Sequence, residues 1–537
     1  MPASWKYPNE RVVAFLDIGT NSLRLLLVRI NPQHSYTILS DQKETIRLGE
    51  GEFIDQRLQP EAMQRAVLVA RKFAEMARSY NAEEIISVAT SATREAENRD
   101  EFLRRLKREA HLDVHTISGP EEARLIYLGV SSGFHLSDQQ ALFIDIGGGS
   151  TELILGNQKD YLFLDSLKLG SIRLTSLFFL PDETEPVNPA RYALLQQYVR
   201  NIAVRAVQEL KNKSVDILIG SSGTLENLAD IAIYAQHKRR RQRDDVVPYP
   251  QLKHTIEMLC SLPLEERRKI PGINPSRADI IVAGASIVDT LMTDLGLREL
   301  HISDRGLRDG LLMDYLSRSE NADLLAGASV RERSIYQLGR ACGFDEKHSQ
   351  EVARLALELF DSASDLGLHK FGEKERELLE YTALVHDVGT FLSYSNHQQH
   401  SYYLIRNFDL LGFDQLEIAV MATAALFHRK AMPSKKKHAE FAALDKPSQQ
   451  MVRLFALLLR LAESLDRSHQ GAVRHAYLCK SKPGEIVLEV HSDQEIELEL
   501  WGVQNHRQAS EKLFRRKMLI EHIQSINESL SLNKQKG

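Results

Sequence analysis

Leu142-Phe-Ile-Asp-Ile-Gly-Gly-Gly-Ser-Thr-Glu-Leu-Ile-Leu-Gly156 runs from an apolar strand through a glycine turn into a second apolar strand. Its only charges, Asp145 and Glu152, flank the turn. The three glycines have no Cβ and can turn backbone N–H groups towards an anion, and Ser150 adds a hydroxyl donor. Carboxylates beside an anion site make sense if a divalent cation lies between carboxylate and phosphate oxygens. The stretch therefore predicts a site for phosphate with Mg²⁺, and an ordinary glycine-rich hairpin is the alternative.

The same device occurs twice in the chain. Asp17-Ile-Gly-Thr-Asn-Ser-Leu-Arg-Leu-Leu-Leu27 aligns without a gap on Asp145 to Leu155. Internal similarity of this kind predicts duplicated lobes, each starting with a hairpin, that face each other across a cleft. At one aligned position Arg24 in the first copy corresponds to Glu152 in the second. One turn would supply positive charge and the other a carboxylate, which suits phosphoryl chemistry.

Five motifs then occur in a fixed order: DIGTNSLR from Asp17, TSATREA from Thr90, SGPEEARLIYLGV from Ser118, DIGGGSTEL from Asp145 and GSSGT from Gly220. In this order they resemble the exopolyphosphatase/guanosine pentaphosphate phosphohydrolase family. The resemblance covers roughly residues 10 to 315, including the stretches 271–284 and 302–310 that would close the second lobe. It implies an α/β fold of two duplicated ribonuclease-H-like lobes, as in the actin and sugar-kinase superfamily.

The resemblance also implies roles for individual residues. By its place in the SGxEEA pattern, Glu122 corresponds to the glutamate that orients and deprotonates the attacking water, with Glu121 as a secondary acid. Acidic residues in a first helical turn are also explained by the helix dipole alone. The catalytic candidates are Glu122, Glu152 and Glu121, and the candidate Mg²⁺ ligands are Asp145 and Glu152. The candidate phosphate-binding residues are Asn21, Ser22, Arg24, Arg94, Gly147, Gly148, Gly149, Ser150, Gly220, Ser222, Gly223 and Thr224.

Composition narrows the classes of function. With 537 residues, 43% hydrophobic, 26% charged and a formal charge of -5, nothing global marks a nucleic-acid or membrane binder. Met1 to Arg11 lacks the apolar core of a signal peptide, and no apolar run approaches the roughly 20 residues of a spanning helix. We expect a cytoplasmic protein without membrane or specific nucleic-acid partners. Local positive charge must then meet an anionic substrate, and the basic run His237 to Arg243 is either an outer contact for a long polyanion or a solvated loop.

We expect four domains: lobes at 1–135 and 136–315, an all-α HD-like domain at 316–475 and a small α+β cap at 476–537. In the cap, alternating apolar residues predict strands near Ala476–Cys479, Glu485–Val490 and Ile496–Leu500, followed by a basic helix.

The helical region has its own set of metal-type side chains. His348, the adjacent His386-Asp387 and Asp466 resemble the pattern of HD-type metal phosphohydrolases, and His400 and His428 fall near the places of extra ligands. Imidazoles and carboxylates together hold a divalent transition metal or Mg²⁺. The alternative is a set of satisfied core histidines.

The sequence thus predicts a Mg²⁺-dependent exopolyphosphatase that removes terminal phosphate from inorganic polyphosphate by attack of water. One alternative is a guanosine pentaphosphate 5′-phosphohydrolase that uses the same cleft. Another is a regulatory protein that binds polyphosphate or an alarmone and reports it through the HD-like domain. The family resemblance also suggests a homodimer.

Overall fold

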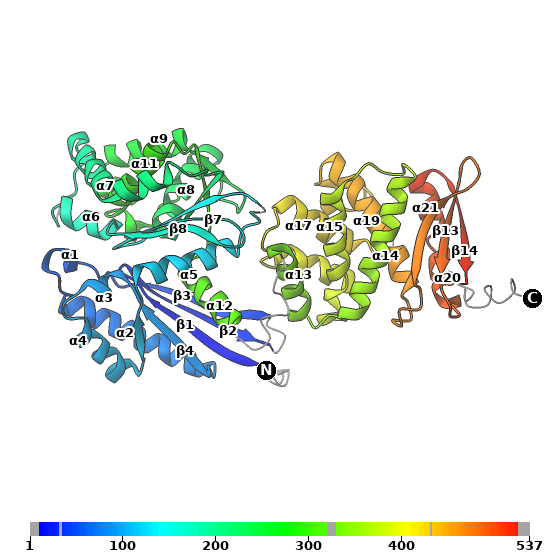
Figure 1. The fold of residues 1–537 in the computed structure, drawn as a ribbon, viewed down its shortest axis with the longest axis horizontal. Helices are drawn as coiled ribbons and strands as arrows, with labels where there is room; N and C mark the ends of the chain where they lie inside the picture. The colour runs from blue at the N-terminus through cyan, green and yellow to red at the C-terminus, as the bar shows by residue number, and fades with distance from the viewer. Residues whose placement is uncertain are drawn as a thin grey trace, which may run out of the picture. The chain divides into compact units, whose positions relative to one another are not determined.

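The computed structural model describes residues 10–31, 35–136, 138–181, 183–318, 329–429 and 432–524. The chain forms two compact units, Met1–Val330 and Arg331–Gly537 (Figure 1). The finer division into four domains stays a prediction. Within the described residues, no helix has both the length and the apolar character that crossing a membrane requires.

The first unit contains two sheets with matching strand order. The first sheet has the order β3-β2-β1-β4-β5 and the second has β10-β11-β9-β6-β7-β8. In the first sheet, β1, β2 and β3 pair antiparallel in turn, and β4 runs parallel to β1. In the second sheet, β6, β7 and β8 pair antiparallel in the same way, and β9 runs parallel to β6. Read from β3 and from β8, the two orders coincide over five strands, which confirms the predicted duplication; β10, antiparallel to β11, is an additional edge strand of the second sheet. The strands are β1 (Arg11–Ile18), β2 (Ser22–Ile30), β3 (Tyr36–Thr45), β4 (Glu84–Ala89), β5 (Val114–Thr116), β6 (Ala141–Ile146), β7 (Thr151–Gly156), β8 (Tyr161–Leu167), β9 (Ile217–Ser221), β10 (Val246–Pro248) and β11 (Glu299–Ile302).

The hairpin register follows the sequence alignment. Asp17 lies opposite Arg24 in the β1–β2 pair, and Asp145 lies opposite Glu152 in the β6–β7 pair. Every residue of β6 and β7 is buried, as expected of central strands covered on both faces. The polar ends of these hairpins therefore lie at the same edge of each lobe.

Helices cover both sheets of this unit. Pro60 opens α2, and its buried residues recur at helical spacing, so that one face packs on the first sheet. The helices are α1 (Glu52–Asp55), α2 (Pro60–Ser79), α3 (Ser91–Glu95), α4 (Arg99–Arg105), a π-helical turn (Leu106–Ala110), α5 (Gly119–Ser131), α6 (Ser171–Phe178), α7 (Pro189–Leu210), α8 (Ser222–His237), α9 (Tyr249–Ser261), α10 (Leu264–Arg267), a 3₁₀ turn (Pro275–Arg277), α11 (Ile281–Leu295) and α12 (Leu307–Ser317).

Helices α5 and α12 join the two lobes. Helix α5 follows the first sheet but packs on β6, β7 and β8, whereas α12 follows the second sheet and packs on β1 and β2. The two helices touch through backbone, because a Cβ on Gly310 would lie 1.8 Å from the Leu125 carbonyl oxygen and one on Gly129 would lie 2.1 Å from the Gly306 carbonyl oxygen. Only glycine permits this approach. The crossing fixes α5, and with it Glu122, against both lobes.

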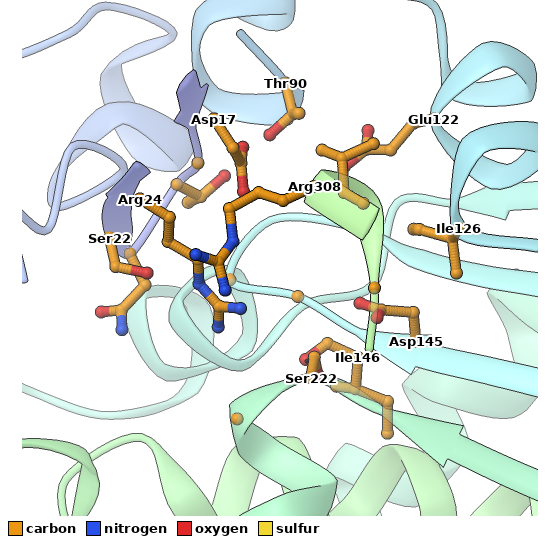
Figure 2. A pocket seen from close by; sticks show the side chains of 18 of the residues that line it. Asp17, Ser22, Arg24, Thr90, Glu122, Ile126, Asp145, Ile146, Ser222 and Arg308 are labelled. Atoms are coloured by element: carbon orange, nitrogen blue, oxygen red, sulfur yellow. Dashed lines mark hydrogen bonds between the residues drawn. The ribbon is translucent and has the colours of Figure 1, made fainter. Parts of the chain in front are cut away.

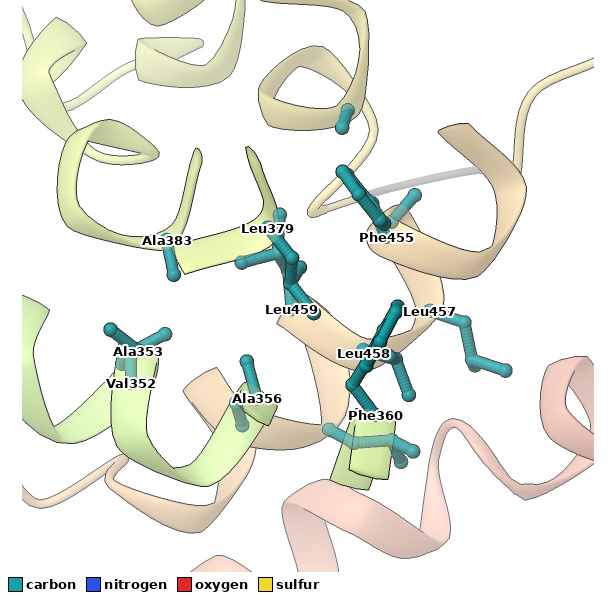
Figure 3. Close-up of a cluster of buried hydrophobic side chains, with 14 of the residues drawn as sticks. Val352, Ala353, Ala356, Phe360, Leu379, Ala383, Phe455, Leu457, Leu458 and Leu459 are labelled. Atoms are coloured by element: carbon teal, nitrogen blue, oxygen red, sulfur yellow. The ribbon is translucent and has the colours of Figure 1, made fainter. Parts of the chain in front are cut away.

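The second unit is a helical layer with a small sheet on one shared core. Figure 3 shows part of this core, where side chains of α14, α15 and α19 meet at Ala356, Leu379 and Leu459. The helices are α13 (Val330–Ala341), α14 (Glu346–Asp365), α15 (Glu373–Val385), a 3₁₀ turn (Val388–Phe391), α16 (His397–Asn407), α17 (Gln415–Leu426), α18 (Ala439–Ala442), α19 (Lys446–Leu465), α20 (Glu497–Gln504) and α21 (Arg507–Phe514). The sheet has the order β12 (His475–Lys480), β13 (Glu485–His491), β14 (Lys517–Ile523).

One predicted strand of the cap is wrong. Residues Ile496–Leu500 lead into helix α20, and the third strand is β14, which runs parallel to β13. The alternating IELEL pattern suggested a strand, but Glu499, Gly502 and Val503 are the buried positions, which is helical spacing.

Candidate active site

Two backbone turns meet at the cleft between the lobes. A Cβ on Gly148 would lie 3.0 Å from the Thr20 Cβ, and one on Gly149 would lie 2.6 Å from the Ser91 Oγ. None of Gly147, Gly148 and Gly149 has a φ in the left-handed region. The glycines are therefore needed for the close approach of the two turns rather than for an unusual backbone conformation.

This cleft encloses about 790 Å³, open solvent at its mouth included (Figure 2). Ser222 opens α8 there with a φ of 76°, a strained value for a residue other than glycine, and its Oγ donates a hydrogen bond to the Ile146 carbonyl oxygen at 2.6 Å. The predicted site residues that line the cleft are Asn21, Ser22, Arg24, Glu122, Asp145, Gly147, Gly148, Gly149, Ser150, Ser222 and Gly223.

Other predicted site residues lie beside or behind the cleft. Glu121 points to Arg124, with 2.8 Å between its carboxylate oxygens and that guanidinium, and this ion pair lowers the pKa of Glu121. Thr224 is buried, and Gly220 allows Leu225 to pack closely against the strand end. Glu121 therefore does not line the cleft. Gly220 and Thr224 lie on either side of Ser222 and Gly223, which do line it.

Arg94 contacts the candidate base. Its Nη1 donates to the Glu122 Oε2 at 2.9 Å and to the Ile117 carbonyl oxygen at 3.0 Å. Ser118 caps α5 by accepting a bond from the Glu121 N–H, so the helix start that carries Glu122 is held from two sides. The structure thus gives Arg94 a contact with Glu122 that the motif alone did not predict.

Four buried carboxylates gather at this point. Burial, opposed in part by Arg94, raises the pKa of Glu122 to about 7, and burial raises the pKa of Asp145 to about 6. Burial, then the charges of Glu122 and Asp145, raises the pKa of Glu152 well above its usual range, although Ser166 donates to Glu152 at 2.8 Å. Asp17 completes the group: burial raises its pKa, and its Oδ1 is buried without a hydrogen-bond partner. This excess of negative charge suits a divalent cation with oxygen ligands.

Positive charge gathers on the facing side. Lys43 lies directly opposite Arg24 in the β2–β3 pair, an unfavourable like-charge arrangement. Burial, followed by the fields of Arg24 and Arg277, lowers the pKa of Lys43 to about 8. Burial, then Arg24, lowers the pKa of Arg277 to about 10. Figure 2 shows that the Arg24 and Arg308 side chains both point into the cleft. An anion in the cleft would relieve this repulsion.

Sequence reasoning missed four of these charged residues as site residues: Asp17, Lys43, Arg277 and Arg308. A signal existed for Asp17, because it opens the first motif copy at the position of Asp145. Arg277 and Arg308 lie in stretches that resemble the family, but neither stretch indicates where its arginine points.

Within the basic run, which has five lysine and arginine residues, Arg239 and Arg241 form ion pairs with neighbouring acids. Arg239 forms two contacts of 2.6 Å with Asp245. Arg241 lies 2.9 Å from Asp230 and 2.6 Å from Asp304. Arg239 and Arg241 hold the loop in place, whereas Lys238 and Arg240 are exposed and are the candidate outer contacts.

In the second unit the predicted metal-type residues also come together. His348 Nδ1 lies 2.8 Å from Asp466 Oδ2, and both His386 and His428 lie near Asp387. Two further residues join them. Glu463 contacts His348 and His386, and His397 occupies the place expected for His400, one helical turn earlier on α16.

Two family models match the chain: the Ppx/GppA phosphatase family over residues 26–319 and Ppx/GppA phosphatase, domain III over residues 330–515. The chain belongs to the Ppx/GppA phosphatase family. Members are hydrolases of phosphoanhydrides that depend on divalent metal ions, which agrees with the carboxylate and arginine groups of the cleft.

A curated relative and two solved structures extend the match. The chain is 29% identical over 482 residues to a guanosine-5′-triphosphate,3′-diphosphate pyrophosphatase of Vibrio vulnificus, covering 90% of this chain and 92% of the relative. It is 27% identical to the crystal structure of an exopolyphosphatase from Cytophaga hutchinsonii, which covers 60% of this chain and 99% of that one with a TM-score of 0.53. An exopolyphosphatase-like protein gives the same identity and TM-score over 57% of this chain and 98% of its own. The two-lobe fold of the family is thus present here.

Proposed function

We propose that the protein removes terminal phosphate from inorganic polyphosphate by direct attack of water on the terminal phosphorus. One observation carries this proposal. The cleft brings together a cluster of buried carboxylates, which needs a cation, and a cluster of arginine and lysine side chains, which needs an anion. A phosphate chain with Mg²⁺ meets both needs, whereas a bare anion or a bare cation meets only one.

Glu122 is the proposed general base. Its pKa of about 7 lets it hold a proton taken from water near neutral pH and release it again after the reaction. The bond from Arg94 at 2.9 Å fixes the orientation of its carboxylate. Arg94 is therefore a positioning residue in this scheme rather than a phosphate ligand.

The reaction balances without a further reactant. The water oxygen forms a bond to the terminal phosphorus, its proton goes to Glu122, and the bridging P–O bond breaks to leave a chain shortened by one phosphate. Arg24 and Arg308 neutralise negative charge on the terminal group as the bond breaks, and backbone N–H groups of the two turns assist.

Mg²⁺ is the proposed metal of the cleft. Asp145 and Asp17 offer cleft-facing carboxylate oxygens, and Glu152 lies behind them in the same group. When held there by Asp145 and Asp17, the ion would offset negative charge on the phosphate chain.

A second candidate substrate is guanosine pentaphosphate, and the relative from Vibrio vulnificus favours it because that match spans nearly all of both chains. In this substrate too, the bond cleaved would be the terminal phosphoanhydride bond. The nucleoside would lie away from the cluster of buried carboxylates. A cytoplasmic location and a homodimer stay predictions.

Phosphate release distinguishes these readings. Purified protein is assayed with Mg²⁺ against polyphosphate and against guanosine pentaphosphate, alongside Glu122→Gln and the matched neighbour Glu121→Gln. We expect a higher kcat/KM for polyphosphate, loss of turnover in Glu122→Gln and near-normal turnover in Glu121→Gln. A higher kcat/KM for guanosine pentaphosphate would transfer the assignment to the second candidate, and full activity in Glu122→Gln would overturn the proposed base.

A further inference from the structure

Three histidines of the second unit have their proton positions fixed by the backbone. His386 Nδ1 lies 2.6 Å from the Ala383 carbonyl oxygen, His428 Nδ1 lies 2.6 Å from that of Ala425, and His397 Nδ1 lies 3.0 Å from that of Tyr394. A carbonyl oxygen only accepts hydrogen bonds, so each Nδ1 carries a hydrogen. In a neutral ring Nε2 is then a bare lone pair. All three rings are buried.

These nitrogens lie close to other acceptors, and among the described residues the one donor beside them is Arg429 Nη1, 3.4 Å from His397 Nε2. His397 Nε2 lies 3.2 Å from His428 Nε2, and the two nitrogens lie 3.0 Å and 3.2 Å from the Asp387 Oδ1. That oxygen is buried without a hydrogen-bond partner. Protonating both rings would place two imidazolium groups 3.2 Å apart, and protonating one leaves the other nitrogen facing an acceptor. A cation between the three atoms satisfies all of them.

A second group repeats the arrangement. His348 Nδ1 lies 2.8 Å from the Asp466 carboxylate and its Nε2 lies 3.0 Å from the Glu463 Oε2, so that a neutral ring that donates to Asp466 presents a lone pair towards Glu463. His386 Nε2 lies 3.1 Å from the same oxygen. The ligand-type atoms of His348, His386 and Glu463 all lie within 4.8 Å of one another.

We propose that this unit holds two adjacent divalent transition-metal ions. Nε2 of His348 and His386 with Glu463 would bind the first, and Nε2 of His397 and His428 with Asp387 the second. Metal–nitrogen and metal–oxygen bonds of about 2.1 Å place neighbouring ligand atoms about 3.0–3.4 Å apart, close to the spacings found here. The Nδ1–H bonds to carbonyl oxygens and to Asp466 orient the rings as outer partners do in metal sites. This site lies outside the cleft residues and goes beyond the proposed function.

The site is open on its carboxylate side. The side chains of Asp387 and Glu463 are 24% and 19% exposed, whereas those of the four imidazoles are at most 3% exposed. Arg429 stands at this opening, with its Nη1 3.4 Å from His397 Nε2 and its guanidinium over the Tyr394 ring. Open metal positions beside an arginine suit an oxyanion, and phosphate is the class of ligand we assign.

Metal content tests the site directly. The full chain is purified without chelator, dialysed, and its Mn, Fe, Co, Ni and Zn are counted by elemental analysis. Chelated protein is then titrated with Mn²⁺ by calorimetry in excess Mg²⁺, which occupies the cleft of the first unit so that only the second unit's ions are counted. We expect about two ions per chain, and about one fewer in Glu463→Gln and in His397→Ala. The matched control is His400→Ala, because His400 lies on the same helix α16 outside the cluster. Glu122→Gln should retain both ions.

Three results would overturn the assignment. They are fewer than one tightly bound ion in the wild-type protein both as purified and after titration, a content of one ion, or equal metal loss in His397→Ala and His400→Ala. Circular dichroism of each variant separates metal loss from unfolding, and the wild-type titration decides the question if a variant fails to fold.

The phosphate assignment has its own test. Inorganic phosphate is added to Glu122→Gln protein loaded with Mn²⁺ in excess Mg²⁺, so that Mg²⁺ rather than Mn²⁺ fills the cleft, and the electron paramagnetic resonance signal of the bound Mn²⁺ is followed. We expect saturable change, with an apparent Kd raised on the order of tenfold in Arg429→Gln. A spectrum that phosphate leaves unchanged would overturn the assigned ligand class.

Discussion

Glu122 allows a quantitative prediction about stability. Burial raises its pKa from the ordinary 4.5 to about 7, so the folded protein binds this proton more tightly than the unfolded chain does. The resulting stability is fully present below pH 4.5 and is lost as the pH rises to about 7. Since one pKa unit corresponds to about 1.4 kcal/mol, the ionised side chain costs about 3 kcal/mol at pH 8.

Glutamine at this position keeps the shape of glutamate and an oxygen for Arg94, but it carries no charge. We therefore expect Glu122→Gln to abolish turnover and yet to be about 2–3 kcal/mol more stable than wild type at pH 8. For a unit of this size, Met1–Val330, the gain is about 3–4 °C in Tm. At pH 4.5 the two proteins should melt together, because the glutamate is then protonated.

Differential scanning calorimetry in the presence of a chelator measures this difference at both pH values. Glu121→Gln is the matched control: it removes an ion pair with Arg124 outside the cleft and should give no gain. Saturating Mg²⁺ should shrink the gain of Glu122→Gln by stabilising the wild-type carboxylates. A Glu122→Gln protein less stable than wild type at pH 8, or a gain equal at both pH values, would refute the reasoning.

Other predictions concern catalysis and the loop. Arg94→Met removes a contact that lowers the pKa of Glu122, so the acid limb of the profile of kcat/KM against pH should move to higher pH by about one unit. An acid limb at the wild-type pH would contradict the influence of Arg94 on the base. Asp145→Ala should raise the Mg²⁺ concentration needed for half-maximal rate, whereas Arg24→Ala should mainly raise KM for polyphosphate. Identical rate losses in both variants, with unchanged metal dependence, would contradict the separate roles of metal ligand and phosphate ligand. Arg240→Ala should weaken the binding of long polyphosphate chains more than that of short ones, while Arg241→Ala should lower Tm by breaking two ion pairs. Equal effects on KM for both chain lengths would show that Arg240 does not contact the substrate.

The duplicated lobes could be predicted because two motif copies align without a gap, and hairpin register then follows from sequence position. Contacts across the lobes could not. The Arg94–Glu122 bond joins α3 to α5, and no local pattern shows where these helix ends meet.

In the second unit the sequence located the metal-type residues but not their places in the cluster. Glu463 and Asp466 are three residues apart at the end of α19, and His397 and His400 are three apart on α16. Such pairs share one helix face, so spacing cannot tell which member reaches the cluster. The structure separates them, because Glu463 lies beside the Nε2 atoms of His348 and His386, while Asp466 lies beside the Nδ1 of His348.

The central reaction is tested most directly by hydrolysing polyphosphate in ¹⁸O-labelled water and locating the label by mass spectrometry. Direct attack on the terminal phosphorus predicts one labelled oxygen in each released orthophosphate, none at the new chain end, and no labelled product with Glu122→Gln. Label at the new end of the shortened chain, or labelled orthophosphate formed at the wild-type rate by Glu122→Gln, would contradict this account.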